Sequence, residues 1–201
     1  MSSCADAEVT LRRGRLRASR LAALPARLAT AEGTTVRQTA SCGDQLLTGG
    51  TGGLGLLTAR WLAASRGAAA LVLASRSGAL ARGGTAEWAL LGASGAAVRI
   101  ARCDAADPAA VRRLLAWTAW TAGAALRVRG VWHAAGVLSD ALLARQTAAT
   151  LARVYGPKAH GAWALQRCTA ALPLEACALF SSVAALLGGA GQVGGYRLST
   201  G

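Results

Sequence analysis

The sequence is poor in lysine and in aromatic residues. Only one of its 22 basic residues, Lys158, is a lysine, and aromatic residues make up 4% of its 201 residues. Because so few aromatic side chains are present, the core must consist of alanine, leucine and valine. This composition suits helices packed on a parallel sheet better than a β-sandwich. Hydrophobic residues still reach 53%, which is ample for the core of one domain.

Paired cysteines and an uninterrupted membrane segment are also missing. The five cysteines are widely spaced and include no Cys-x-x-Cys pair, which argues against a zinc site and a disulfide framework. The apolar stretch at 54–75 is interrupted by Arg60 and Arg66, whereas a membrane helix needs about 18 uncharged apolar residues. We therefore expect a soluble protein with no metal and no membrane contact, in the reducing environment of the cytoplasm.

Acidic residues are scarce as well, and the formal net charge is +13. Such a charge can indicate nucleic-acid binding when the basic residues gather in a patch or stripe. Here the arginines are scattered along the chain, which compositional bias explains better. We expect no nucleic-acid partner.

The first 43 residues differ from the rest of the chain. An arginine-rich stretch at 11–17 is compatible with a transit peptide for a plastid or mitochondrion. Asp6 and Glu8 argue against this, because such leaders usually avoid acidic residues. The alternatives are a linker or the tail of an upstream segment. We therefore separate residues 1–43 from a domain at residues 44–201.

From Asp44 onward, short apolar runs alternate with segments of helical spacing. The apolar runs predict strands at 45–48, 70–74, 96–101, 128–133 and 174–180. Helical spacing and cap signals predict helices at 54–65, at 85–91 with Thr85 as N-cap, from Asp107-Pro108, and at 147–168 with a bend near Pro157. This order predicts an α/β fold with a Rossmann-like, doubly wound parallel sheet and helices on both faces.

A glycine-rich loop lies between the first predicted strand and the first predicted helix. Its spacing is T-G-x-x-x-G-x-G, with the threonine at position 48. Glycines let the backbone approach a pyrophosphate closely, and the following helix supplies unpaired N–H groups and the positive end of its dipole. The loop therefore predicts dinucleotide binding by Thr48, Gly49, Thr51, Gly52, Gly53, Leu54 and Gly55.

The ends of the next two strands indicate which dinucleotide is bound. Ser75-Arg76-Ser77 contains no carboxylate for a ribose 2′-hydroxyl, and an arginine can hold a 2′-phosphate with two hydrogen bonds. This favours NADPH, although Arg76 is also compatible with a solvated loop charge. After the third strand, Cys103-Asp104 offers a carboxylate that either accepts from the adenine amino group or caps the next helix.

Several segments resemble the ketoreductase domains of polyketide synthases and animal-type fatty acid synthases, which are short-chain dehydrogenases/reductases. The similar segments are 46–55, 71–78, 103–104, 132–138, 156–163 and 179–188. The most specific is Pro-Lys-x-x-Gly-Ala-Trp at 157–163, because synthase ketoreductases carry their lysine on this helix. Other short-chain dehydrogenases place it four residues after the catalytic tyrosine.

The resemblance implies NADPH-dependent reduction of the β-keto group of an acyl chain on an acyl carrier protein, within a multidomain synthase. It assigns Lys158 and Ser182 to the catalytic lysine and serine, and it adds Ala134, Ala135 and Gly136 to the cofactor site. In this family a tyrosine donates the proton, the serine holds the carbonyl oxygen, and the lysine lowers the pKa of the tyrosine.

The catalytic tyrosine is where the chain departs from the family pattern. Counting 13 residues from Ser182 leads to Gly195, so the candidate Tyr196 is off register by one, and Thr200 stands where the family has asparagine. Three readings fit: an insertion absorbed by the loop, a loss of activity, or an artificial end of the reading frame. The resemblance also predicts a fold that is incomplete at the C-terminus. The alternative function is that of a catalytically inactive, structural remnant of a synthase.

The two histidines are expected to be non-catalytic. His133 ends the fourth predicted strand, where a packing and backbone role is expected, and His160 is expected on the surface of its helix.

Overall fold

The computed structural model describes residues 9–12, 15–18, 43–121, 128–139 and 145–182. The chain divides into two compact units, of which one comprises residues 38–137 and 155–180. The other comprises residues 1–37, 138–154 and 181–201.

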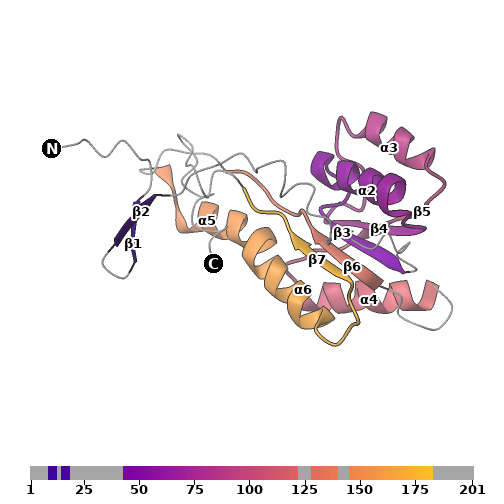
Figure 1. The fold of residues 1–201 in the computed structure, drawn as a ribbon. Helices are drawn as coiled ribbons and strands as arrows, with labels where there is room; N and C mark the ends of the chain where they lie inside the picture. Colours follow the sequence, from indigo (N-terminus) through magenta and orange to yellow (C-terminus); the bar gives the residue numbers. More distant parts are fainter. Residues whose placement is uncertain (1–8, 13–14, 19–42, 122–127, 140–144, 183–201) are drawn as a thin grey trace. The chain divides into compact units, whose positions relative to one another are not determined.

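The larger unit is built on a five-stranded parallel sheet (Figure 1). Its strands are β3 (Asp44–Thr48), β4 (Ala70–Ser75), β5 (Ala97–Arg102), β6 (Val128–His133) and β7 (Ala176–Leu179). They are ordered β5-β4-β3-β6-β7, so the chain runs outward from β3 in one direction and then returns to its other side. The strand order reverses between β3 and β6, and in open α/β sheets ligands bind beside this switch point.

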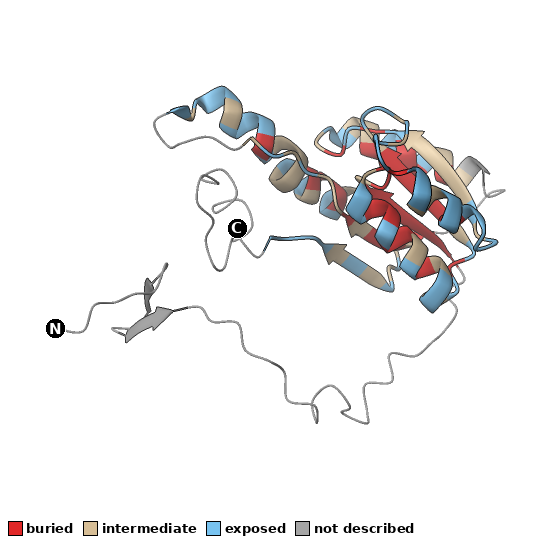
Figure 2. Ribbon diagram, turned by 90° about the horizontal axis from the view of Figure 1, so that it is seen from above, coloured by how far each residue is buried: buried red, intermediate tan, exposed pale blue. Residues whose placement is uncertain are grey.

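Helices cover both faces of the sheet. Apolar residues of β3 and β4 alternate between two cores, so that Leu46 and Val72 face one side while Leu47 and Leu73 face the other. On the first side they pack against α4 (Pro108–Thr121) and α6 (Gly161–Thr169). On the second side they pack against α2 (Gly53–Arg66) and α3 (Thr85–Gly92). The central strands are buried between these layers (Figure 2), which confirms the predicted doubly wound fold.

The helix starts agree with the sequence prediction at α4 and differ at α3. The backbone N–H of Ala109 donates to Asp107 Oδ1 at 2.8 Å, as expected for an Asp-Pro start. The prediction of Thr85 as an N-cap is wrong, because Thr85 is the first helical residue and Gly84 is the cap. A β-carbon on Gly84 would lie 2.8 Å from Leu56 Cδ1, so the cap packs closely against a side chain of α2.

The predicted helix at 147–168 is three consecutive segments. These are α5 (Ala148–Tyr155), the π-helix η2 (Gly156–His160) and α6. The N–H of Gly161 donates to the carbonyl of Gly156, five residues earlier, and to the carbonyl of Lys158. The irregularity predicted at Pro157 is therefore confirmed, in the form of a widened turn. Such π-turns are frequently found at functional sites.

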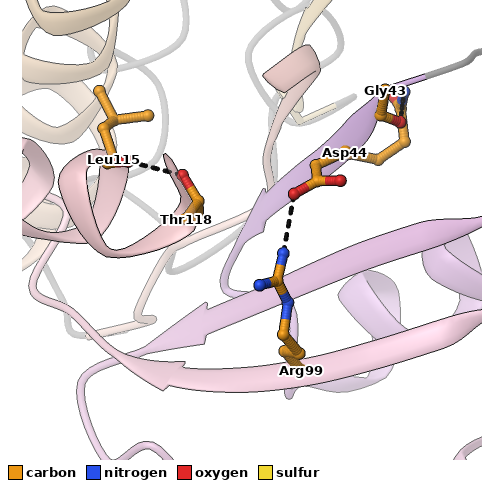
Figure 3. A network of polar contacts seen from close by, with 6 residues as sticks. Gly43, Asp44, Arg99, Leu115 and Thr118 are labelled. Carbon is orange, nitrogen blue, oxygen red and sulfur yellow. Dashed lines mark hydrogen bonds and ion pairs between the residues drawn. The ribbon is translucent and has the colours of Figure 1, made fainter. Parts of the chain in front are cut away.

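An ion pair joins two strands that are not neighbours. Asp44 Oδ2 on β3 lies 2.7 Å from Arg99 Nη2 on β5, so the pair reaches across β4 (Figure 3). Asp44 is buried, and the Arg99 guanidinium lies 5.2 Å from the centre of the Trp117 ring on α4. Asp44 begins β3, so its carboxylate lies at the opposite end of this strand from the glycine loop.

The other unit contains an antiparallel hairpin of β1 (Val9–Arg12) and β2 (Arg15–Ala18), which the sequence analysis did not predict. Within the described part of the chain, no helix combines the length and the apolar character that crossing a membrane requires.

Candidate functional site

A cleft of about 740 Å³ lies at the carboxyl edge of the sheet, between the loops that follow β3, β4, β5 and β6. It includes the switch point between β3 and β6, where dinucleotides bind in this class of fold. Every residue predicted to bind the cofactor lines this one cleft: Thr48, Gly49, Thr51, Gly52, Gly53, Leu54, Gly55, Ser75, Arg76, Cys103, Asp104, Ala134, Ala135 and Gly136. The cleft is also lined by Ser77, Ala81, Ala105 and Pro157, which the sequence analysis did not assign to it.

The glycine loop is shaped by close backbone contacts. Gly49 has φ of 71°, and a β-carbon there would lie 2.6 Å from the nitrogen of Ala135. A β-carbon on Gly55 would meet the carbonyl oxygen of Gly49. These two positions therefore require glycine, because the loop folds tightly against the segment after β6 and against itself.

Gly53 differs from these two glycines because it faces open space. A β-carbon on Gly53 would have no heavy atom within 4 Å. The helix α2 begins there, its N-cap Gly52 makes no side-chain cap hydrogen bond, and its first turn holds no acidic residue. The first N–H groups of α2 thus lie beside a cradle that a β-carbon would partly fill. This donor set fits the pyrophosphate of a dinucleotide.

The loop after β4 holds Arg76 by its backbone. The carbonyl of Arg76 accepts a hydrogen bond of 3.1 Å from Nε of Arg102, at the end of β5. Ser75 Oγ accepts from the N–H of Gly78 at 3.2 Å and tightens the same turn. The Arg76 side chain is exposed at the cleft, and no described carboxylate lies within ion-pairing distance of it. Its guanidinium fits a phosphate monoester on the ribose.

The Cys103-Asp104 pair lies beside this loop, since the N–H of Cys103 donates to the carbonyl of Ser75 at 2.8 Å. Asp104 Oδ1 accepts from the N–H of Ala106 at 3.0 Å, so the carboxylate stabilises the turn before α4. Its contact with an adenine stays a prediction. Burial raises the pKa of Cys103 to about 11, and the charges of Asp104 and Asp107 add to this effect. Cys103 is therefore a neutral thiol at physiological pH.

Lys158 approaches the cleft from the π-helix. A β-carbon on Gly136 would lie 3.2 Å from Lys158 Cε, so the lysine side chain passes beside a residue that lines the cleft. The preceding residue, Pro157, lines the cleft itself. The structure thus brings the candidate lysine to the nucleotide site.

The other two catalytic candidates are not brought together with Lys158 by the described residues. Ser182 is exposed and belongs to the other unit. Tyr196 lies outside the described residues. Both assignments stay predictions.

His133 contacts Thr48, which lines the cleft, and the backbone of Lys158, and the sequence did not reveal either contact. It is buried, its Nδ1 lies 2.6 Å from Thr48 Oγ1, and its Nε2 lies 3.1 Å from the carbonyl oxygen of Lys158. The sequence signal that could have indicated these contacts is that His133 is a polar residue at the end of a central strand. The other histidine, His160, is exposed as predicted. Across the described residues, no group of three or more His, Cys, Asp or Glu side chains could hold a metal ion.

Comparison with known proteins agrees with this geometry. The sequence model of the KR domain family matches residues 43–196. The chain is 44% identical over 150 residues to polyketide synthase GfsA of Streptomyces halstedii, which covers 75% of the chain and 2% of that protein. It is 45% identical over 150 residues to phthioceranic/hydroxyphthioceranic acid synthase of Mycobacterium tuberculosis, covering 75% of the chain and 7% of that protein. The chain thus spans a small part of these relatives.

Solved structures show the same likeness. A-type ketoreductases from a modular polyketide synthase superpose with a TM-score of 0.73 at 37% identity, over 96% of this chain and 40% of theirs. A ketoreductase from the first module of phoslactomycin biosynthesis in Streptomyces sp. HK803 gives a TM-score of 0.70 at 32% identity, over 96% and 42%. The fold and the cleft at its switch point define a Rossmann-type domain of the short-chain dehydrogenase/reductase class. Within that class, the chain belongs to the ketoreductase (KR) domain family of polyketide synthases.

Proposed function

We propose that the chain binds NADPH in the cleft and reduces the β-keto group of an acyl chain carried by an acyl carrier protein. One observation carries the proposal: a single cleft gathers the glycine loop, the carboxylate-free Arg76 loop and the approach of Lys158 beside Gly136. This arrangement supports a dinucleotide site with a cation for carbonyl chemistry beside it.

The nucleotide is held by the chain through two kinds of group. The first N–H groups of α2 and the glycine backbone bind the pyrophosphate, because they are donors in a cradle free of side chains. Arg76 binds the 2′-phosphate, with its backbone held by Arg102. NADPH over NADH is then selected by Arg76.

The bound nucleotide supplies the hydride to the carbonyl carbon. The chain must then stabilise negative charge on the carbonyl oxygen and deliver a proton to it. In the proposal Tyr196 donates the proton, Ser182 holds the oxygen, and Lys158 favours the ionised tyrosine through its charge. Lys158 is the member of this group whose approach to the cleft supports the proposal.

The partners follow from the family and are part of the same proposal. The curated relatives are multidomain synthases of which the chain matches a small fraction, so we propose that other synthase domains present the substrate. The described cysteines Cys103, Cys168 and Cys177 are free thiols, which supports a cytoplasmic location.

A fluorescence titration with NADPH and NADH tests the cofactor assignment. NADPH should bind more tightly, and Arg76→Ala should weaken NADPH about 10- to 100-fold while leaving NADH within about twofold. Arg112→Ala, an exposed arginine that does not line the cleft, is the matched control. Equal affinity for both nucleotides in the parent chain would refute selection by Arg76.

Reduction of a simple cyclic ketone such as a decalone tests catalysis. NADPH oxidation should depend on ketone, and Lys158→Met should lower kcat without removing NADPH binding. Tyr196 lies one residue beyond the position of the family's catalytic tyrosine. This favours a second possibility, that the chain is a ketoreductase-like structural part of a synthase and does not catalyse the reduction. Tight NADPH binding without ketone reduction would establish that alternative.

A further inference from the structure

His133 carries a hydrogen-bond partner on each ring nitrogen. Nδ1 faces the hydroxyl of Thr48, where the glycine loop begins, and Nε2 faces the backbone carbonyl of Lys158 on the π-helix. The residue therefore links the nucleotide-binding loop to the turn that bears the candidate catalytic lysine. Its side chain is almost entirely buried, with 4% exposed.

The two partners determine the protonation of the ring. A carbonyl oxygen can only accept, so Nε2 must carry the hydrogen and donate it to Lys158. In a neutral imidazole Nδ1 is then an acceptor, and the Thr48 hydroxyl donates to it. Burial lowers the pKa of His133 below 6.5, and the backbone hydrogen bonds to Lys158 and Pro157 oppose this effect. The neutral Nε2–H form is thus the one that the site holds.

The surroundings leave the imidazole little freedom. A β-carbon on Gly161 would lie 2.9 Å from His133 Cε1, so the start of α6 packs directly against the ring. The N–H of Ala134 donates to the carbonyl of Thr48 at 2.9 Å, which holds the strand ends on the other side. His133 therefore acts as a rigid spacer between the end of β3 and the π-helix.

The π-helix needs such a fixed point. Pro157 has no N–H to donate, and the wide turn that follows it is a less favourable geometry than an α-turn. The Lys158 carbonyl is held from two directions, by the N–H of Gly161 and by His133 Nε2. The side chain of the same residue passes Gly136 at the cleft. Fixing the carbonyl therefore fixes where the lysine side chain begins.

We propose that His133 is a positioning residue for Lys158, which it places by donating Nε2–H to the Lys158 carbonyl and by accepting from Thr48. Its kinetic consequence rests on the proposed reductase function, whereas the structural link itself does not.

Three substitutions separate the two hydrogen bonds. His133→Gln places an amide N–H near the position of Nε2 and can keep the bond to Lys158. His133→Asn ends near the position of Nδ1, so it can accept from Thr48 but is too short to reach Lys158. His133→Leu fills similar space and keeps neither bond. If the bond to the Lys158 carbonyl is what matters, His133→Gln should behave most like the parent. His133→Asn should behave like His133→Leu, because both lose that bond.

The single lysine of the chain gives a readout that does not depend on activity. Incorporation of lysine labelled with ¹³C at its carbonyl produces one signal, from Lys158, in the 201-residue chain. A carbonyl ¹³C shift responds to hydrogen bonding at the oxygen. His133→Asn and His133→Leu should therefore move the signal, whereas His133→Gln should leave it close to its position in the parent. A signal at the same shift in all four proteins would overturn the proposal.

Kinetics supply the second readout, with folding checked by thermal melting. Asn and Leu should lower kcat for ketone reduction roughly 10- to 100-fold, since misplacement by about 1 Å costs about 100-fold. The NADPH Kd should stay within about threefold, and Gln should recover most of kcat. An equal loss of kcat in His133→Gln and His133→Asn would overturn the positioning role. So would a parallel loss of kcat, NADPH affinity and melting temperature in all three variants.

The two proposals fail in different ways. If the parent chain neither binds NADPH nor reduces a ketone, the proposed function fails, while the labelled carbonyl still tests the link from His133. If the parent is active and the ¹³C shift of the Lys158 carbonyl is the same in all His133 variants, the positioning proposal alone fails.

Discussion

A β-carbon built on Gly136 would lie 3.2 Å from Cε of Lys158. Gly136 follows β6 and lines the cleft, so the lack of a side chain there gives the lysine its path to the site. The nearest neighbour is a flexible side chain, so an added methyl group would displace the lysine and leave the backbone in place.

We therefore expect Gly136→Ala to impair catalysis more than folding. The kcat for ketone reduction should fall about tenfold, because small displacements of a catalytic group are costly. The melting temperature should change little, as measured by circular dichroism. A matched Gly92→Ala variant, at a site away from the cleft where a β-carbon meets nothing within 4 Å, should leave kcat unchanged. An unaltered kcat in Gly136→Ala would contradict this view of Lys158.

The glycines of the loop should separate folding from binding. Gly49→Ala should lower the free energy of unfolding by about 2 kcal/mol or more, because φ is positive and the methyl group would meet Ala135. Gly53→Ala should fold normally and weaken NADPH, since its methyl group would occupy open space beside the start of α2. Urea unfolding and fluorescence titration measure the two effects. Normal NADPH affinity in a folded Gly53→Ala would argue against this binding mode.

Arg102 should support cofactor selection indirectly. Arg102→Ala removes the hydrogen bond to the Arg76 carbonyl and loosens the loop. One such bond is worth about 0.5–1.5 kcal/mol, so NADPH should weaken roughly 2- to 10-fold, less than in Arg76→Ala. NADH affinity should not change. If Arg102→Ala weakened both nucleotides equally, the loop would have no specific role in holding the 2′-phosphate.

Because of His133, the free energy of unfolding should decrease as the pH falls below 6.5. Burial lowers the folded-state pKa of His133 from 6.5, so the stabilising contribution is fully present above pH 6.5. As the pH falls below 6.5, the unfolded chain gains a proton that the folded chain resists, and this contribution is lost through the folded-state pKa. Urea unfolding between pH 7.5 and about 5 should show this decline in the parent and a smaller decline in His133→Gln. Identical pH profiles would place the acid sensitivity elsewhere.

The Asp44–Arg99 pair should contribute measurably to stability. Asp44 is buried, and its removal leaves a half-buried guanidinium without this carboxylate. We expect Asp44→Ala to cost about 1–3 kcal/mol. In a double-mutant cycle, the Asp44→Ala/Arg99→Met protein should lose less than the sum of the single changes. The exposed pair of Arg113 with Asp107, at 3.6 Å, is the control, and Arg113→Ala should cost under about 1 kcal/mol.

The alternation of apolar runs was enough to predict the order of elements in the domain. The strands at 45–48 and 128–133 were placed within a residue of β3 and β6, because buried parallel strands are short, continuous apolar runs. Asp107-Pro108 located the start of α4, since both residues act locally. The cap of α3 was predicted one residue late, since Gly84 is the cap and Thr85 the first helical residue. Gly84 packs against Leu56, a contact that local sequence does not encode.

The cleft could be predicted further than the catalytic centre. The predicted cofactor residues lie at four strand ends, and parallel strands bring their carboxyl ends to one edge. The links from His133 to Lys158 and from Arg102 to Arg76 join residues 25 and 26 positions apart, and no local pattern specifies such pairs. Sequence identified the lysine through its family position, while what holds the lysine in place was visible only in three dimensions.

The contact between Gly161 and His133 carries an evolutionary consequence. A β-carbon at residue 161 would lie 2.9 Å from Cε1 of the ring, so a side chain there would force the imidazole or the start of α6 to shift. Residues 133 and 161 should therefore covary among relatives. In a lineage that acquires alanine or serine at 161, we expect a smaller residue to replace the histidine, and the present anchor of the lysine-bearing turn would be lost with it.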